Sequence, residues 1–342
     1  GCRAIAGIED LHITTCNDRG EDGLPPCSCD GGPCSPEPVL GQDQARNVFL
    51  MRADRGKLFL FASRTVESCS ADACATTLFE LYDAKSNHYF TYGSVAEDGL
   101  YLAEAWGPPS SSMGALRFVS RNGVQNHELV TGLAAPTSVE AAPGRLYWSD
   151  PGPDTALFGK IGTCSLPACS DPKTIASDLE LPSQVFVDGA DVLVTAVIFP
   201  GNVQTGALYR CSPGATCATR TMVYAGPGLG SYPFDIALAG GALFVPATYF
   251  DKRESAIYRI DGDGTATLLA TDPGLFAVAA TTDAVYWTNP DEGTVKKLSY
   301  EDANATPVVL ARNQGLPTPI AVDDTHVYWI DDADASAWRI PR

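Results

Sequence analysis

A sevenfold repeat of short apolar segments constrains the fold more than any other feature of this 342-residue sequence. The segments are rich in aromatic and β-branched residues, which favour β-strands. They begin at residues 58, 100, 146, 192, 243, 285 and 327, so successive starts are 42, 46, 46, 51, 42 and 42 residues apart. Units of about 40–45 residues that cannot bury their own faces must stack, as the blades of a β-propeller do. The sequence therefore predicts an all-β fold of stacked units.

Each repeat has the pattern of a four-stranded blade. Seven and five residues before every apolar segment stand apolar or small residues, and this period of two indicates an inner strand. Residues suited to a tight reversal, such as Gly56 and Gly144, separate that strand from the apolar segment. Two further strands follow; in the fifth repeat, Asp-Gly-Asp-Gly at 261–264 is a strong hairpin signal between them.

The two ends of the chain complete one blade between them. The last repeat offers three strands and lacks a fourth, whereas residues 37–44 near the N-terminus match the strand and link at 306–314. Pairing this N-terminal strand with the last three strands closes a ring and removes exposed sheet edges. We therefore expect a seven-bladed β-propeller over residues 36–342, closed by an N-terminal strand that completes the last blade.

Close cysteine pairs recur at one place in the repeat, the reversal between the third and fourth strands. We expect the disulfides Cys69–Cys74, Cys164–Cys169 and Cys211–Cys217 there, and two further bridges of open pairing among Cys16, Cys27, Cys29 and Cys34. The alternative is zinc, but the cysteine intervals exceed the usual two to four residues and no histidine stands beside them. Disulfides indicate an oxidising compartment.

The segment before the propeller has a composition of its own. Residues 1–35 are rich in Asp, Gly, Pro and Cys and cannot form a core alone, so we expect a Cys-rich tether. Its opening, Gly1-Cys2-Arg3, resembles the end of a bacterial lipoprotein signal. The resemblance implies a lipid on Cys2 and, with Arg3 in place of Asp, anchoring to the outer membrane of a Gram-negative bacterium, in the periplasm or at the extracellular face. The alternative is a remnant unrelated to secretion.

Three apolar segments share a motif. They read Tyr-Trp-Ser-Asp at 147–150, Tyr-Trp-Thr-Asn at 286–289 and Tyr-Trp-Ile-Asp at 328–331. These tetrads resemble the Tyr-Trp-Thr-Asp repeats of receptor propellers and of related bacterial NHL-like propellers, and the likeness spans about residues 36–342. The resemblance implies that the aromatic residues wedge between blades and that Asp150, Asp331 and, less closely, Asn289 tie neighbouring blades together. These roles are structural, and no residue is assigned a catalytic one.

Charge and composition disfavour several classes of partner. The sequence has 23 Lys and Arg against 41 Asp and Glu, a net charge of −18, which disfavours nucleic acids and anionic lipid surfaces. Contact with a membrane is then expected only through a lipid on Cys2. The four histidines are scattered and support neither a three-histidine metal site nor a Ser–His–Asp triad. We expect no metal and no cofactor.

In a propeller, the connections from second to third strand and from fourth strand to the next blade share one face, where ligand binding is expected. Aromatic and acidic residues in these connections are the ligand-binding candidates: Trp106, Phe199, Tyr232, Phe234, Tyr249, Phe250 and Asp251. Aromatic planes beside carboxylates suit sugar rings, peptides or cationic groups. The alternative is that these residues cap the ends of the hydrophobic blades.

The sequence favours a non-enzymatic, secreted or surface-anchored protein that binds a carbohydrate, peptide or protein through the loop-bearing face. A structural subunit of an extracellular assembly, with self-association, is one alternative. A hydrolase or lyase resembling lactonases or strictosidine-synthase-like enzymes, with its site in the central channel, is another. Of the inner-strand positions six and eight residues before each apolar segment, only Glu140 and Asp235 are carboxylates, too few for a calcium site.

Alkylation of the unreduced protein, followed by intact-mass measurement, tests the cysteine assignment. Five disulfides would use ten of the 11 cysteines, so we expect no alkylated thiol other than Cys2 when it bears no lipid. Several alkylated thiols would contradict the disulfide framework.

Overall fold

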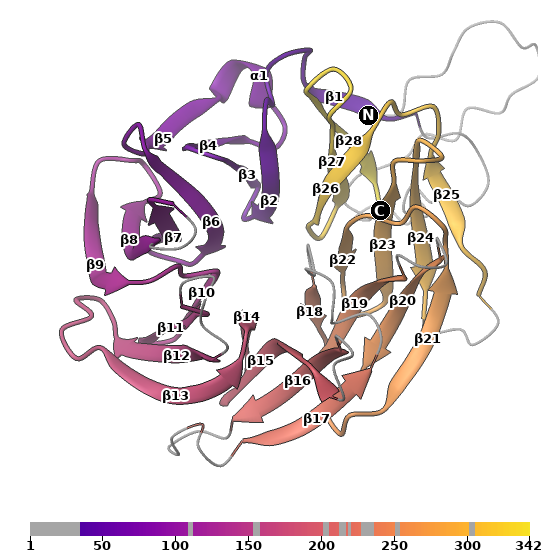
Figure 1. Cartoon of the computed structure of the whole chain (residues 1–342). Helices are drawn as coiled ribbons and strands as arrows, with labels where there is room; N and C mark the ends of the chain where they lie inside the picture. Colours follow the sequence, from indigo (N-terminus) through magenta and orange to yellow (C-terminus); the bar gives the residue numbers. More distant parts are fainter. Residues whose placement is uncertain are drawn as a thin grey trace, which may run out of the picture.

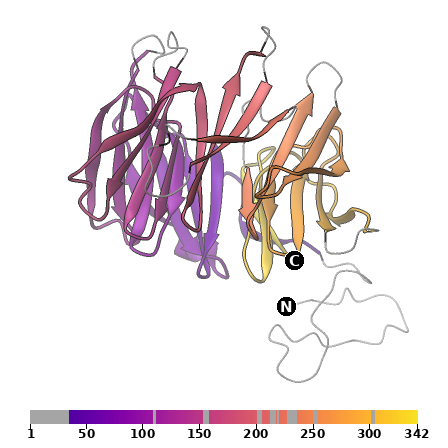
Figure 2. The ribbon, with the colours of Figure 1, turned by 90° about the horizontal axis from the view of Figure 1, so that it is seen from below.

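The computed structural model describes residues 35–108, 112–152, 158–200, 205–211, 217, 220–226, 236–249, 254–300 and 305–342. In this part of the chain, 28 strands form seven four-stranded antiparallel sheets around a common axis (Figure 1). Figure 2 shows the ring from the side, with the strands running between its two faces. The protein is a seven-bladed β-propeller, as the repeat predicts.

Each blade begins at the centre of the ring with an inner strand and continues outward with a second strand. The inner strands of blades 1 to 7 are β2 (Val48–Asp54), β6 (His88–Val95), β10 (Ser138–Ala142), β14 (Pro182–Asp188), β18 (Ala237–Ala239), β22 (Val278–Ala280) and β26 (Pro317–Val322). The second strands are β3 (Lys57–Ala62), β7 (Gly99–Trp106), β11 (Arg145–Asp150), β15 (Asp191–Ile198), β19 (Ala242–Tyr249), β23 (Ala284–Asn289) and β27 (His326–Asp331). Each second strand begins one residue before its predicted apolar segment.

The outer half of each blade is a second antiparallel pair. The third strands are β4 (Thr65–Ser70), β8 (Met113–Ser120), β12 (Phe158–Ser165), β16 (Thr205–Cys211), β20 (Glu254–Ile260), β24 (Thr294–Ser299) and β28 (Ser336–Pro341). The fourth strands are β5 (Phe79–Asp83), β9 (Asn126–Leu133), β13 (Lys173–Glu180), β17 (Thr221–Gly226), β21 (Ala266–Thr271), β25 (Val308–Ala311) and, in blade 7, β1 (Glu37–Leu40). A short helix, α1 (Cys74–Thr77), links β4 to β5.

The N-terminal strand closes the ring. β1 pairs antiparallel with β28, so that Glu37 lies opposite Arg339 and Leu40 opposite Ala337. The Arg339 guanidinium donates to Glu37 Oε2 (3.2 Å), and it also donates to Asp72 Oδ1 (2.7 Å) in blade 1. One side chain therefore connects the closing strand, the C-terminal strand and the neighbouring blade.

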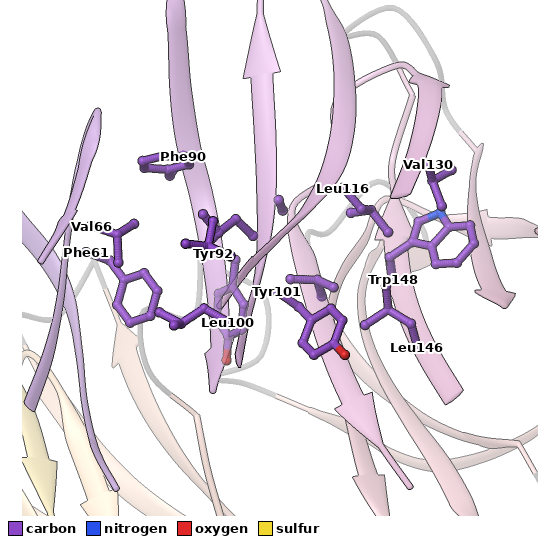
Figure 3. Close-up of a cluster of buried hydrophobic side chains, with 14 of the residues drawn as sticks. Phe61, Val66, Phe90, Tyr92, Leu100, Tyr101, Leu116, Val130, Leu146 and Trp148 are labelled. Carbon is purple, nitrogen blue, oxygen red and sulfur yellow. The ribbon is translucent and has the colours of Figure 1, made fainter. Parts of the chain in front are cut away.

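The hydrophobic core lies between blades. Side chains from β3, β6, β7 and β11 interleave in one cluster that spans blades 1 to 3 (Figure 3). Phe61 of blade 1 packs so closely on Gly93 of blade 2 that a Cβ at Gly93 would lie 2.1 Å from the ring. Trp148, Trp287 and Trp329 of the tetrads are all buried. Because each sheet buries both faces against its neighbours, the blades stabilise one another.

The last residue of the tetrad bonds to the link that arrives from the preceding blade. The Asp150 carboxylate accepts hydrogen bonds from the backbone N–H groups of Ala134 (3.1 Å) and Ala135 (3.0 Å). Asp331 accepts from the equivalent pair at 315–316, at 2.6 and 2.8 Å. Asn289 donates instead, to Asp272 Oδ1 and to the Pro273 carbonyl, both at 2.7 Å.

The third residue of the tetrad makes the direct contact with the following blade. Ser149 Oγ donates to the Ser183 carbonyl of β14 (2.7 Å), and Thr288 Oγ1 donates to the Thr318 carbonyl of β26 (2.8 Å). A hydroxyl at this position thus bridges second and inner strands of adjacent blades. Blade 7 has Ile330 here.

Three disulfides link the third strand to the connection that follows it, in blades 1, 3 and 4. They are Cys69–Cys74, Cys164–Cys169 and Cys211–Cys217. They indicate an oxidising compartment, extracellular or periplasmic. The cysteines expected in the tether, Cys2, Cys16, Cys27, Cys29 and Cys34, lie outside the described residues. Across the described ranges, no helix is long and apolar enough to cross a membrane.

Truncating Leu40 tests the contribution of the closing strand. Leu40 is fully buried and packs with Met51 of blade 1 and Ile330 of blade 7. We expect Leu40→Ala to lower the free energy of unfolding by about 2–5 kcal/mol, measured by urea denaturation, because it leaves a cavity at the seam. Val308→Ala is the control, since Val308 also lies on a fourth strand but is 40% exposed. Equal, small losses in both variants would contradict this role.

Candidate functional site

One face of the ring holds the connections from second to third strand and from fourth strand to the next inner strand (Figure 2). We call it the loop-bearing face. Trp106 ends β7, Phe199 directly follows β15, and Tyr249 ends β19, so the fold places all three at this face. The other predicted ligand-binding residues, Tyr232, Phe234, Phe250 and Asp251, lie outside the described residues.

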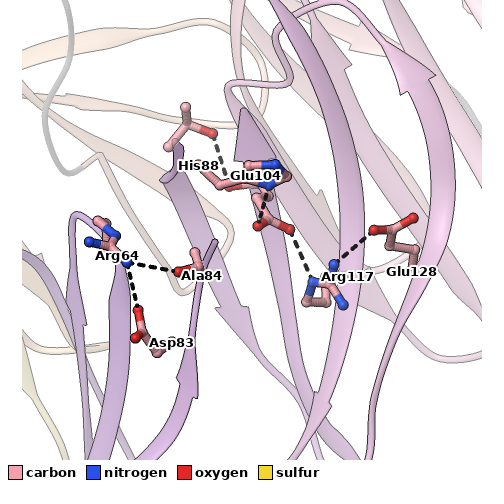
Figure 4. Close-up of polar contacts among 9 residues, drawn as sticks. Arg64, Asp83, Ala84, His88, Glu104, Arg117 and Glu128 are labelled. Carbon is pink, nitrogen blue, oxygen red and sulfur yellow. Dashed lines mark hydrogen bonds and ion pairs between the residues drawn. The ribbon is translucent and has the colours of Figure 1, made fainter. Parts of the chain in front are cut away.

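Trp106 is held by a stack at the rim of blade 2. Its ring lies 4.3 Å from the ring of His88, with an interplanar angle of 10°. His88 begins β6, and its Nδ1 lies 2.9 Å from Glu104 Oε1 (Figure 4). One side of the indole is thereby covered, and its orientation is fixed by a histidine that is itself held in place.

The support under this stack is a buried ionic network. Arg117 Nε donates to Glu104 Oε2 (3.0 Å), and its NH2 donates to Glu128 Oε1 (2.9 Å) (Figure 4). Glu104 is fully buried, and both of its oxygens have partners, as a buried carboxylate requires. Burial, reinforced by the charge of Glu104, raises the pKa of the nearby Tyr82. The network stiffens the rim below Trp106.

Large apolar side chains surround the loop-bearing face. Five of them stand at or within two residues of the start of a third or inner strand, Phe199 follows the end of a second strand, and each is 40–54% exposed. We call this set the apolar rim: Tyr89, Met113, Phe158, Phe199, Phe276 and Leu316. Exposed apolar groups gathered on one face mark interaction surfaces. Sequence reasoning missed Met113, Phe158, Phe276 and Leu316, whose shared signal is a large apolar residue where a strand leaves this face.

A cavity of about 630 Å³ opens on the same face, beside the seam where blade 7 meets blade 1. The connections β1–β2 and β27–β28 supply Asp43, Arg46, Asp332 and Asp334, and Phe276 adds an aromatic wall. Asp43 pairs with Arg46 at 2.8 Å. The lining thus has three carboxylates and one guanidinium, and we call this hollow the acidic cavity. The described ligand-binding candidates, Trp106, Phe199 and Tyr249, lie on blades 2, 4 and 5 and do not line this cavity.

Ring closure shapes the acidic cavity. The Asp43 N–H donates to the Asp334 carbonyl (2.8 Å), and the Ala45 N–H donates to the Ala335 carbonyl (2.7 Å). Burial, together with the charge of the neighbouring Asp331, raises the pKa of Asp332. A cationic group placed in the cavity would relieve this crowding of negative charge.

A second cavity, of about 290 Å³, lies among the inner strands, and we call it the channel cavity. Its polar wall includes Arg52, Tyr92 and Glu140, and Arg52 NH2 donates to the Tyr92 hydroxyl at 2.8 Å. Burial raises the pKa of Glu140 to about 7, although Arg52 and a hydrogen bond with Ser94 oppose the shift. The other inner-strand carboxylate of the sequence analysis, Asp235, lies outside the described residues.

The described lining of the two cavities contains no group of metal ligands. Within the described ranges, no group of three or more His, Cys, Asp and Glu side chains is placed to hold a metal ion. What the described geometry offers is an apolar rim and an acidic cavity at one face, and a separate polar wall inside the channel.

Comparison with known proteins supports the fold. No family model matches the chain, and no curated protein matches it. Among solved structures, it is similar to a catalytically inactive virginiamycin B lyase from Staphylococcus aureus, with 15% identity over 90% of this chain and 99% of that one, at a TM-score of 0.63. It is also similar to YCF48 bound to D1 peptide, with 10% identity over 92% and 96% of the two chains and a TM-score of 0.60.

A third similar structure comes from a nidogen/laminin complex. The identity is 12% over 76% of this chain and 95% of that one, with a TM-score of 0.53. The chain shares a propeller fold with all three. At these identities the likeness concerns the fold, and function has to be inferred from the sites.

Replacing Glu140 tests the burial of its carboxyl group. A pKa raised from 4.5 to about 7 means that the folded state binds this proton more tightly than the unfolded state does. Ionisation of Glu140 therefore costs stability progressively as the pH rises from about 4.5 through 7. Relative to wild type, Glu140→Gln should gain up to about 3 kcal/mol of unfolding free energy between pH 4.5 and pH 8.

Urea denaturation of both proteins at the two pH values measures this gain. Glu97→Gln is the control, because the Glu97 side chain is 84% exposed. A difference between wild type and Glu140→Gln that does not change with pH would show that the carboxyl group is not buried as described.

Proposed function

We propose that this protein is a non-enzymatic binding protein that recognises a protein or peptide partner through its loop-bearing face. The observation on which this rests is the apolar rim. Its six side chains surround the face that also contains the acidic cavity. Aromatic and methionine side chains are enriched in protein interfaces, and a rim of this kind gives a partner apolar area to cover.

The acidic cavity indicates what such a partner presents. It combines Asp43, Asp332 and Asp334 with an aromatic wall from Phe276, in a chain of net charge −18. A lysine or arginine side chain in the cavity would contact these carboxylates as well as the aromatic ring of Phe276. We infer a partner segment with a basic residue flanked by apolar ones. A carbohydrate would use the aromatic groups but would gain less from the carboxylates.

The similar structures are compatible with this proposal. One of them, YCF48, is bound to a peptide, and another comes from a nidogen/laminin complex. Their support is limited to the shared fold. Trp106, Phe199 and Tyr249, with Tyr232, Phe234, Phe250 and Asp251 by their place in the sequence, belong to the proposed surface.

We further propose that the protein is presented outside the cytoplasm on a lipid anchor. Three disulfides support the compartment, and the resemblance of Gly1-Cys2-Arg3 to a lipoprotein signal supports a lipid on Cys2. Residues 1–35 would then be the tether between the propeller and the outer membrane. In that arrangement the loop-bearing face is available to a partner from the surroundings.

Selection from a random-peptide phage library on the whole chain tests the binding proposal. We expect enriched peptides to combine Lys or Arg with aromatic or aliphatic residues. Phe199→Ser and Asp332→Asn should each weaken binding of a selected peptide about tenfold or more, because each removes a contact at the surface. Added salt should weaken peptide binding less in Asp332→Asn than in wild type, because the variant lacks one of the charges that salt screens.

Matched controls lie elsewhere on the ring. Phe79→Ser removes a side chain that is 58% exposed on the fourth strand β5, and Asp324→Asn removes an exposed carboxylate from the β26–β27 hairpin. Both should bind as wild type does. The proposal fails if no peptide is enriched, or if the controls lose as much affinity as Phe199→Ser and Asp332→Asn. Trp106→Ala shows in addition whether the stacked indole contributes.

A further inference from the structure

The channel cavity is separate from the loop-bearing face. Its lining lies toward the ends of the inner strands that lead into the first hairpins, such as Met51–Ala53 of β2, Ala279–Ala280 of β22 and Ile320–Val322 of β26. Its volume of about 290 Å³ lies at the small end of ligand pockets, which are about 300–1,000 Å³. A ligand held there would be small and would be enclosed by the ring.

Seven structurally equivalent positions define the character of the channel. In every blade this inner-strand residue lies opposite the second residue of the apolar segment on the neighbouring second strand. The pairs are Arg52 with Phe59, Ser94 with Tyr101, Glu140 with Tyr147, Phe186 with Leu193, Ala237 with Phe244, Ala279 with Tyr286, and Ala321 with Tyr328. Blades 1 to 3 thus place polar groups at this level, and blades 5 to 7 place alanine. The channel has a polar side and an apolar side with room between them.

The polar side begins with a fixed guanidinium. Arg52 NH2 donates to the Tyr92 hydroxyl (2.8 Å), Arg52 NH1 donates to the Met51 carbonyl (3.2 Å), and the guanidinium carbon lies 5.5 Å from the centre of the Tyr92 ring. These contacts hold the arginine at the cavity wall. A guanidinium is the side chain best suited to a carboxylate, through paired hydrogen bonds.

Glu140 supplies the opposite charge from blade 3, with blade 2 between it and Arg52 of blade 1. It lines the same cavity, bonds with the Ser94 hydroxyl and is within electrostatic range of Arg52. Burial raises its pKa to about 7, which shows that these two neighbours do not offset the cost of its charge. An ammonium group of a ligand would offset that cost. The rest of the described lining is apolar, apart from Tyr92.

We propose that the channel cavity binds a compact zwitterion, an α-amino acid with an apolar side chain. Arg52 takes the carboxylate and Glu140 takes the ammonium group. The apolar side chain lies against Phe186 and the alanines of blades 5 to 7. This site is independent of the proposed partner-binding surface, because the two are lined by different residues.

Isothermal titration calorimetry with L-phenylalanine tests the proposal. The two matched probes are 3-phenylpropanoate, which lacks the ammonium group, and 2-phenylethylamine, which lacks the carboxylate. We expect L-phenylalanine to bind about tenfold or more tightly than either probe, because only it satisfies both charges. Its affinity should rise between pH 6 and pH 8 as Glu140 ionises. Arg52 and Tyr92 are the other titratable groups in the described lining.

Three variants separate binding from folding. Arg52→Met and Glu140→Gln should each weaken binding of L-phenylalanine about tenfold or more, and Glu140→Gln should also remove the pH dependence. Ala279→Leu fills the apolar side and should abolish binding. Circular dichroism and melting curves check that each variant is folded. Phe199→Ser and Asp332→Asn, at the loop-bearing face, should leave binding unchanged.

The outcomes are decisive in either direction. Absence of binding by L-phenylalanine and by L-leucine to the wild-type chain overturns the proposal. If 3-phenylpropanoate or 2-phenylethylamine binds as tightly as L-phenylalanine, the site does not recognise both charges of a zwitterion and that part of the proposal is wrong. Undiminished binding to folded Ala279→Leu overturns the location in the channel.

Discussion

The pairing of β1 with β28 is the contact on which the rest of the structure depends. A blade with three strands would leave β28 with an unpaired edge and would leave one side of blade 1 without a complete neighbour. Two side chains join the closing strand to blades 7 and 1. Arg339 does so through hydrogen bonds to Glu37 and Asp72, and Leu40 does so through the hydrophobic core. The same closure brings the β1–β2 and β27–β28 connections together. The acidic cavity is therefore a product of the seam.

Stacking blades leaves few places for a ligand. Both faces of each sheet are covered by neighbours, so side chains in mid-strand serve packing, as Phe61 against Gly93 shows. Both cavities accordingly lie where the sheets do not cover one another, at the loop-bearing face and in the channel. The inner strands serve both: β2 contributes Val48 and Phe49 to the acidic cavity and Arg52 to the channel cavity. The two sites share a rigid scaffold and differ in the residues that line them.

The fold was accessible from the sequence because its signals are local and repeated. Seven apolar segments, their spacing and an isolated strand near residue 37 were enough to predict the ring, and the second strands begin within one residue of the predicted positions. The disulfides followed from short cysteine intervals at one place in the repeat. Such patterns are repeated seven times or confined to a few residues, so a single sequence displays them clearly.

The sites were less accessible because they join residues from distant repeats. Asp43 and Asp334 are almost 300 positions apart and meet only through ring closure. Four members of the apolar rim were missed for another reason: a large apolar residue at the start of a strand, such as Phe158, is taken for a core residue until its exposure is known. The inner-strand positions were identified, but considered one at a time they indicated only too few carboxylates for calcium, and not that Arg52 of blade 1 and Glu140 of blade 3 line one cavity.

The channel has polar residues from blades 1 to 3 on one side and alanines from blades 5 to 7 on the other, and the fold itself does not require this difference. Blades 5 to 7 show that alanine satisfies the fold at this level, with Ala279 and Ala321 buried against their neighbours. Blade 3 instead places Glu140 there, where burial makes its charge costly. Arg52 reduces that cost without removing it, so the ionised form of Glu140 remains disfavoured in the folded protein. The ammonium group of the zwitterion that we propose would supply the charge that this carboxylate lacks.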